Sequence, residues 1–288
     1  MAERTINLFT LHSRHWQSNR YVYPVISRRS KGLSIGVNLN PDKACNFDCI
    51  YCSVDRSAPP VYREVDLSIL RDELEHMVQF AVSGEIWKTP PFDKTPENLR
   101  RINDIAFSGD GEPTSYPQLT EVCDLSARLL QQASLSDVKL VLITNATLLH
   151  RPNVRQALEF LDQHNGEIWA KLEAGTEDYY RLIERTTIPL SRVLDNIRSA
   201  GQARPIVIQS LFMNVNSAPP SDHEINEYIS RLKELKRDKC QIKLVQVYTV
   251  ARAPAEAYVT HLAPQQLDTI AARVREIPLP VETYYGPD

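Results

Sequence analysis

The chain contains 288 residues, of which 42% are hydrophobic and 24% are charged, proportions typical of an ordinary globular protein. Its 33 basic and 36 acidic residues give a formal net charge of −3, which disfavours a protein whose main partner is a phosphate backbone. The longest apolar run, from Val138 to Ile143 and interrupted by Lys139, is far shorter than the ~20 residues that span a bilayer. Residues 1–20 lack the apolar core of a signal peptide. We therefore expect a cytoplasmic protein with no membrane partner.

Short β-type runs alternate with longer helical patterns along the chain. Strands are predicted at 33–39, 104–107, 139–144, 167–172, 206–212 and 242–248. Helical spacing of apolar residues predicts helices at 66–82, 119–133, 154–163, 190–200 and 222–235. Each connection is long enough for a crossover, so we expect parallel strands with helices packed outside them, an α/β fold. Periodicity does not distinguish an open sheet from a full or partial barrel.

Polar clusters follow four of the predicted strands. They are 40–52, 108–112, 144–147 and 173–176. Both open parallel sheets and barrels place their chemistry at the carboxyl ends of the strands. The sequence therefore predicts a functional site at this edge of the sheet.

Three of the five cysteines lie within eight positions, in a C-x3-C-x2-C array formed by Cys45, Cys49 and Cys52. Thiolates at this spacing suit a compact iron–sulfur centre with one coordination position left open. Structural zinc is the alternative, but a closed zinc site needs a fourth Cys or His ligand at a familiar spacing. Cys123 is most simply a core residue of a helix, and Cys240 ends a charged stretch. The array predicts an iron–sulfur site that is open for chemistry.

With Tyr51 as the aromatic residue, the array resembles the C-x3-C-x-aromatic-C signature of the radical S-adenosylmethionine (SAM) enzymes. The segment Ser108-Gly109-Asp110-Gly111-Glu112 is similar to the Gly-Gly-Glu motif that follows the second strand in that family. Other segments between about 33 and 262 are similar to the branch that contains the tRNA wyosine-forming enzymes and uncharacterised iron–sulfur oxidoreductases. The resemblance implies a partial, TIM-like (β/α)6 barrel at 33–262. Residues 1–32 are expected to form an extension over the barrel mouth, and 263–288 a C-terminal tail or helix.

The resemblance also implies a 4Fe-4S cluster held by Cys45, Cys49 and Cys52, with SAM bound at the open iron. Glu173 is expected to hold the ribose of SAM and Lys171 to pair with its carboxylate, with Arg185 as the alternative cation. A surface ion pair is the competing interpretation of Lys171 and Glu173. The full set expected to bind the cofactor is Tyr51, Ser108, Gly109, Asp110, Gly111, Glu112, Asn145, Lys171, Glu173 and Gln209.

In such enzymes a one-electron donor such as flavodoxin or ferredoxin reduces the cluster, and a 5′-deoxyadenosyl radical abstracts hydrogen from the substrate. We expect a small-molecule or nucleoside substrate. A tRNA is disfavoured by the charge and by the lack of additional cluster ligands. The sequence also allows a protein or peptide substrate, or a non-catalytic zinc-bearing module. Arg28 and the adjacent Arg29 could meet an anionic or aromatic substrate or simply cap the barrel as loop residues. Candidate substrate contacts are Tyr21, Arg28, Asn214, Asn216, Tyr248 and Arg252.

Overall fold

A computed structural model describes residues 16–287 of the chain. Its main sheet follows the order β1-β2-β3-β4-β5-β6-β7-β9, in which β2 to β7 and β9 are parallel and β1 is antiparallel to β2. A short strand, β8 (Val259–His261), pairs with the end of β6. The other strands are β1 (Val22–Ser27), β2 (Gly32–Val37), β3 (Ile102–Phe107), β4 (Lys139–Thr144), β5 (Gly166–Lys171), β6 (Ile206–Val215), β7 (Ile242–Thr249) and β9 (Val281–Tyr284).

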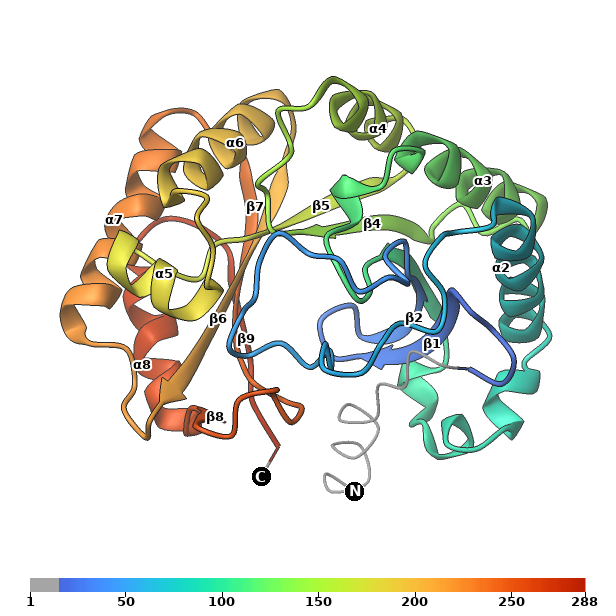
Figure 1. Ribbon diagram of the computed structural model, residues 1–288, viewed down its shortest axis with the longest axis horizontal. Coiled ribbons are helices and arrows are strands. Elements are labelled where there is room, and N and C mark those ends of the chain that lie inside the picture. Colours follow the sequence, from blue (N-terminus) through green and yellow to red (C-terminus); the bar gives the residue numbers. More distant parts are fainter. Residues whose placement is uncertain (1–15, 288) are drawn as a thin grey trace.

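The sheet curls into a half-barrel whose convex side is covered by helices, and its open side faces downward in Figure 1. The predicted α/β fold and the partial TIM-like barrel are therefore confirmed. The helices are α2 (Leu67–Val82), α3 (Leu119–Gln132), α4 (Pro152–Asp162), α5 (Glu177–Glu184), α6 (Leu190–Ala203), α7 (Asp222–Arg237) and α8 (Pro264–Arg275). Short 3-10 turns occur at Glu85–Lys88, Phe92–Lys94, Glu97–Leu99 and Pro113–Ser115. Among the described residues, none of the helices has the length and apolar character needed to cross a membrane.

Two apolar layers hold the half-barrel together. The main core lies between the sheet and the helices, where Leu70, Leu74 and Met77 of α2 are fully buried. A smaller cluster lies on the inner, concave face and contains Ala106, Val141, Trp169 and Val207. Because both faces are covered, β2 is buried at all six positions, as expected for a parallel sheet.

Four elements of the structure have no clear signal in the sequence. Strands β1 and β9 lie inside the predicted extension and the predicted tail, and β8 follows β7. The sequence of β1 contains Pro24, which weakens a strand pattern but is tolerated on an edge strand, while β8 and β9 are only three and four residues long. The eight-residue helix α5 is too short to give a clear periodic signal. The predicted division of the chain at 32 and 262 stays a prediction.

The two edges of the sheet approach each other through the β1–β2 turn. Lys31 Nζ lies 3.1 Å from Glu282 Oε1 of β9, and the guanidinium of Arg28 donates to the carbonyl oxygen of Tyr285. The Tyr284 hydroxyl, which donates to the Glu282 carboxylate, lies 3.5 Å from the carbonyl oxygen of Arg29. These contacts bring the turn across the open side of the half-barrel.

Candidate functional site

One cavity, about 270 Å³ in volume, extends along the concave side of the half-barrel. Its walls come from the loop after β2, the loop after β3, the inner faces of the strands and the β1–β2 turn. Of the residues expected to bind the cluster or SAM, those lining it are Cys45, Cys49, Cys52, Tyr51, Ser108, Gly109, Asp110, Gly111, Glu112, Asn145, Lys171 and Gln209. Of the candidate substrate contacts, Arg28, Tyr248 and Arg252 line it. The fold therefore brings most of the predicted site to one place.

The cysteine loop is anchored by backbone and amide hydrogen bonds. The amide of Asp48 donates to the carbonyl oxygen of Glu184 at 3.0 Å, and that of Ile50 donates to Ile183 at 2.9 Å. The Asn145 side chain donates to Asn46 Oδ1 at 2.7 Å. The end of α5 and the loop after β4 thus hold the three half-buried, unoxidised thiols in place.

The thiols occupy different electrostatic environments. Burial raises the pKa of Cys45 and, together with the nearby Glu184 carboxylate, raises that of Cys49 further. Burial also acts to raise the pKa of Cys52, but the charge and hydrogen bond of Arg56 outweigh it, so this pKa is lowered. Arg56 Nη1 lies 3.1 Å from Cys52 Sγ. Neither Arg56 nor Glu184 is among the residues predicted from the sequence; Arg56, four residues after Cys52, could have been found from its position.

The glycines of the motif after β3 are required by protein packing. A Cβ atom on Gly109 would lie 2.2 Å from Asn38 Oδ1, and one on Gly111 would lie 2.0 Å from the Ala44 carbonyl oxygen. The Asp110 amide donates to Asn38 Oδ1 at 3.1 Å, and Asn38 returns a bond to the Asp110 carboxylate at 2.7 Å. Glycine at these positions is expected to allow close approach of a ligand; the structure shows that it first allows this loop to pack against the loop after β2.

The carboxylate of Glu112 connects the motif to the end of β4. It is 3% exposed and accepts hydrogen bonds from the Thr114 amide at 3.1 Å, Thr144 Oγ1 at 2.6 Å and the Asn145 amide at 2.7 Å. Burial raises its pKa in spite of these donors. Because its oxygens are occupied by protein donors, Glu112 holds the shape of the cavity wall.

Behind the cysteine loop lies a buried group of charged and hydroxyl side chains. The Tyr51 hydroxyl donates to the carboxylate of Glu173 and lies 3.2 Å from both oxygens of Glu184. Lys171 Nζ lies 3.4 Å from the same hydroxyl and 5.0 Å from the Tyr51 ring centroid. Tyr248 donates to Glu173 Oε1 at 3.3 Å. The Lys171 ammonium group thus lies near the carboxylates of Glu173 and Glu184, and the Tyr51 hydroxyl contacts both carboxylates.

The charges in this group influence one another strongly. Burial and the neighbouring Glu173 raise the pKa of Glu184 well above its usual value. Burial acts to lower the pKa of Lys171, but the Glu173 carboxylate and other acidic neighbours outweigh it, so the pKa is raised and Lys171 stays cationic. Glu173 itself is absent from the cavity lining, because the Tyr51 and Tyr248 hydroxyls cover it.

Several predicted residues lie elsewhere. The Tyr21 hydroxyl donates to the carbonyl oxygen of Glu64 beside the start of α2, away from the cavity. Asn214 donates to the His261 carbonyl oxygen at 2.8 Å in the β6–β8 pair, and Asn216 lies in the turn after β6 with a φ of 51°. All three residues lie outside the cavity lining, because β6 continues beyond its predicted end and carries the asparagines away, while Tyr21 precedes β1. Their role as substrate contacts stays a prediction.

Arg185 also lies outside the cavity lining. It pairs with Glu256 at 2.6 Å and donates to the Tyr258 hydroxyl at 2.7 Å. Between the two cations considered for the SAM carboxylate, Lys171 is therefore the one that faces the cavity.

The residues present fit an iron–sulfur cluster with an organic ligand beside it. Three thiols and an ammonium group line the same space, and Gln209 Oε1, on a fully buried side chain, has no hydrogen-bond partner there. No three His, Cys, Asp or Glu side chains within 16–287 come together closely enough to hold a single metal ion. Cluster thiolates bind different irons and need not converge on one atom.

Comparisons with known proteins agree with this geometry. The model of the radical SAM superfamily matches residues 39–218, more than half of the chain. A UPF0026 protein from Methanocaldococcus jannaschii is 26% identical over 256 residues, covering 88% of this chain and 70% of the relative. Three other curated relatives are matched over only 30–39% of their own length.

Solved structures share the fold. A radical SAM methyltransferase from Sphaerobacter thermophilus has a TM-score of 0.61 at 14% identity, covering 92% of this chain and 69% of that one. A structure of TYW1 with a lysine-pyruvate adduct has a TM-score of 0.51 at 14% identity, covering 94% and 81%. By its cysteine array, its half-barrel and its match over residues 39–218, the chain belongs to the radical SAM superfamily of enzymes.

Proposed function

We propose that Cys45, Cys49 and Cys52 hold a 4Fe-4S cluster and that SAM binds beside it in the cavity. The observation that carries this proposal is that the three thiols, the loop after β3 and Lys171 line one continuous space. When bound, the two groups supply reductive cleavage of SAM to methionine and a 5′-deoxyadenosyl radical, which removes a hydrogen atom from the substrate.

The chain's own residues bind and orient these groups. Lys171 stays cationic and pairs with the SAM carboxylate, since a half-buried ammonium group favours an ionised oxygen partner. Gln209 Oε1 offers an acceptor inside the cavity. Glu173 binds the ribose hydroxyls after they replace the hydroxyl of Tyr51 or Tyr248, the two groups that now occupy its oxygens.

The charge and hydrogen bond of Arg56 lower the pKa of Cys52 and so favour its thiolate form, which is the form that ligates metal. Arg56 Nη2 donates to the Asp110 carbonyl oxygen at 3.1 Å, so Arg56 also connects the cysteine loop to the loop after β3. The electron comes from a donor such as flavodoxin or ferredoxin that docks near the cysteine loop, where the Asp48 side chain is 62% exposed. Clustered free thiols suit the reducing cytoplasm as the working compartment.

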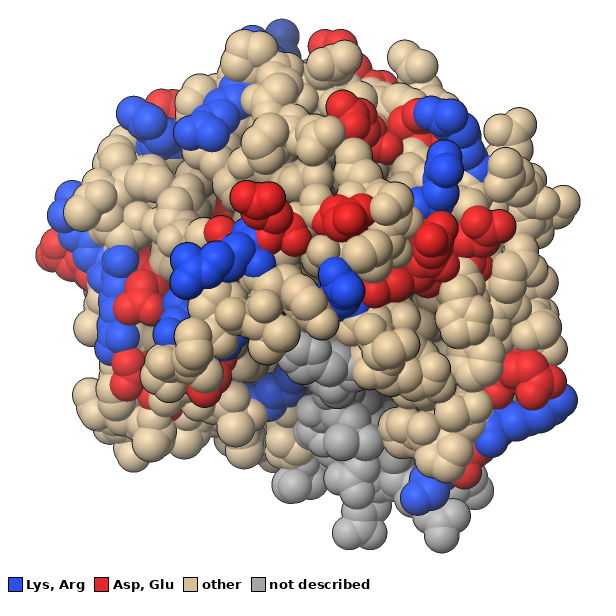
Figure 2. Space-filling model, turned by 45° about the vertical axis from the view of Figure 1, so that its right-hand side comes forward, with Lys and Arg blue, Asp and Glu red and all other residues tan. Residues whose placement is uncertain are grey.

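A small molecule or nucleoside is the substrate that we favour over tRNA. On the face shown in Figure 2, basic and acidic side chains are intermixed over the described residues. An extended basic surface is the usual footprint of a protein that grips a phosphate backbone. The net charge of −3 supports the same choice. If the substrate is a peptide instead, a substrate screen would find turnover with peptides and none with small molecules.

The test is anaerobic reconstitution followed by a metal count and a SAM-cleavage assay. We expect about four irons per chain and formation of 5′-deoxyadenosine on addition of reductant and SAM. Cys49→Ala is expected to abolish cleavage, whereas Cys123→Ala, a matched control inside α3, retains it. About one zinc per chain without cleavage would contradict the proposal and favour a non-catalytic metal module.

A further inference from the structure

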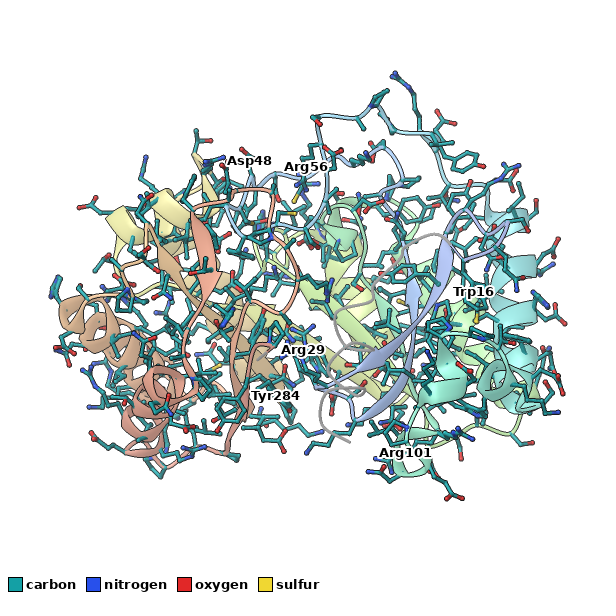
Figure 3. All side chains as sticks on the ribbon, turned by 90° about the horizontal axis from the view of Figure 1, so that it is seen from below. Trp16, Arg29, Asp48, Arg56, Arg101 and Tyr284 are labelled. Atoms are coloured by element: carbon teal, nitrogen blue, oxygen red, sulfur yellow. The ribbon has the colours of Figure 1, made fainter. Side chains whose placement is uncertain are left out.

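The far end of the cavity is built around two adjacent arginines. Arg28 and Arg29 lie in the β1–β2 turn and both line the cavity. The Arg29 guanidinium carbon lies 4.9 Å from the centroid of the Tyr248 ring and 5.7 Å from that of Trp169. Figure 3 shows Arg29 between the two halves of the molecule, on the path from the cysteine loop, marked by Asp48 and Arg56, toward the opposite end of the sheet.

Protein carboxylates do not neutralise these two guanidinium groups. Within 16–287, neither arginine has a carboxylate oxygen within ion-pair distance. Asp104 is near enough for the Arg29 charge to act on its pKa, but its carboxylate accepts its hydrogen bond from Ser34. Glu282 is paired with Lys31 at 3.1 Å. Two cations against one nearby carboxylate leave this end of the cavity net positive.

Half-buried guanidinium groups are costly without an anionic partner. Burial and the neighbouring Arg29 lower the pKa of Arg28 to about 10, so it keeps its charge at neutral pH. The Arg29 guanidinium carbon lies over the Tyr248 and Trp169 rings, and contact with ring faces does not use its N–H donors. A planar guanidinium matches the paired oxygens of a carboxylate or a phosphate.

The arginine pair is also close to the place where SAM is proposed to bind. Tyr248 connects the two positions, because its ring lies beside Arg29 while its hydroxyl donates to Glu173 at 3.3 Å. A molecule whose oxyanion is held by Arg28 and Arg29 would therefore extend along the Tyr248 ring toward Glu173. The same stretch of wall includes Gln209.

We propose that Arg28 and Arg29 bind an oxyanion group, a carboxylate or a phosphate, on the substrate of this enzyme. The substrate is then a small anionic molecule rather than a neutral nucleoside. Its assignment as the substrate rests on the proposed function, whereas the anion site itself is a property of the chain without cluster or SAM.

The first experiment measures anion binding to the cluster-free protein by isothermal titration calorimetry, with inorganic phosphate and with succinate as probes. We expect one site per chain for at least one probe, and the tighter probe identifies the oxyanion. Arg28→Gln and Arg29→Gln should each weaken binding about ten- to hundredfold, the usual effect of losing one charge-assisted hydrogen bond. The matched control is Arg101→Gln, which removes the same charge from an exposed residue outside the cavity lining (Figure 3).

Absence of stoichiometric binding by the wild-type protein would overturn the proposal, as would equal affinities in Arg29→Gln and Arg101→Gln. A second titration uses reconstituted protein with saturating SAM. Anion binding that persists supports a substrate site, whereas displacement by SAM would show that the arginines serve SAM and would overturn the assignment. The first titration needs neither the cluster nor SAM. Anion binding without any SAM cleavage would therefore contradict the proposed function but not the anion site.

Discussion

Asp104 illustrates how burial acts on a single residue of this cavity. Its side chain is 2% exposed, and burial raises its pKa to about 6 although Ser34 donates to it and Arg29 lies nearby. The folded state therefore binds this proton more tightly than the unfolded chain does. As pH rises from about 4 to about 6, the folded state loses stability relative to the unfolded state, and the penalty stays in place above that range.

We predict that Asp104→Asn removes this penalty. At pH 7.5 the variant should be more stable than the wild type by roughly 2–3 kcal/mol, and the gain should shrink as pH falls toward 4. Urea unfolding at pH 7.5 and at pH 4.5 measures the difference. Asp137→Asn, at an exposed position, is the control for removing a charge. A gain of the same size at both pH values would contradict the pKa assignment.

The sequence predicts the role of the three cysteines but not the role of every residue that surrounds them. The spacing of Cys45, Cys49 and Cys52 is local, so the ligand set could be read directly from the chain. Glu184 gave no such signal, because it stands in a short helix more than 130 residues from Cys49 and Tyr51. Its role depends on how α5 packs against the cysteine loop.

At the level of elements, α7 supports the loop that leads from β5 to α5. The Glu224 carboxylate, 4% exposed, accepts hydrogen bonds from the amide of Gly175, from the amide of Thr176 at 3.2 Å and from its hydroxyl at 2.5 Å. A Cβ atom on Gly175 would lie 2.0 Å from the Tyr228 amide nitrogen, so loop and helix pack closely. This contact positions α5, whose end anchors the cysteine loop.

We predict that Glu224→Ala destabilises the protein by about 2–4 kcal/mol, because the buried Gly175 amide and the partly buried Thr176 amide lose their acceptor. Glu227→Ala removes the same charge from the same helix, but its ion pair with Arg231 is partly exposed and is worth about 0–1 kcal/mol. Urea unfolding compares the two variants. Equal losses of stability would show that Glu224 acts only as a surface charge.

The strands also differ in how clearly the sequence predicts them, according to their length and their position in the sheet. The buried parallel strands β2 to β7 are six to ten residues long, and their apolar residues predict strands. The edge strands β1 and β9 have one hydrogen-bonded neighbour each, and their short or proline-containing sequences do not show a strand by themselves. Pairing with the sheet makes them strands.

For the whole molecule, the order of the sheet predicts an order of local stability. Central strands such as β4 and β5 have neighbours on both sides, whereas β1 and β9 lie at the edges. We predict that amides of β4 and β5 exchange hydrogen much more slowly than those of β1 and β9, since edge strands can open without disrupting the core. Hydrogen exchange followed by mass spectrometry checks this. Equally slow exchange in β1 and β4 would mean that the contacts between the β1–β2 turn and β9 close the barrel cooperatively.

Local patterns in the chain determined the α/β class, the cysteine array and the motif after β3, because strand runs, helical periodicity and ligand spacing are all short-range properties. Tertiary structure alone decided that Tyr51 and Tyr248 cover Glu173, that Lys171 rather than Arg185 faces the cavity, and that Arg29 lies beside Tyr248. Arg29 and Tyr248 stand more than 200 positions apart in the sequence. They meet because the curled sheet brings its first turn across to its last strands, a long-range contact that no local pattern records.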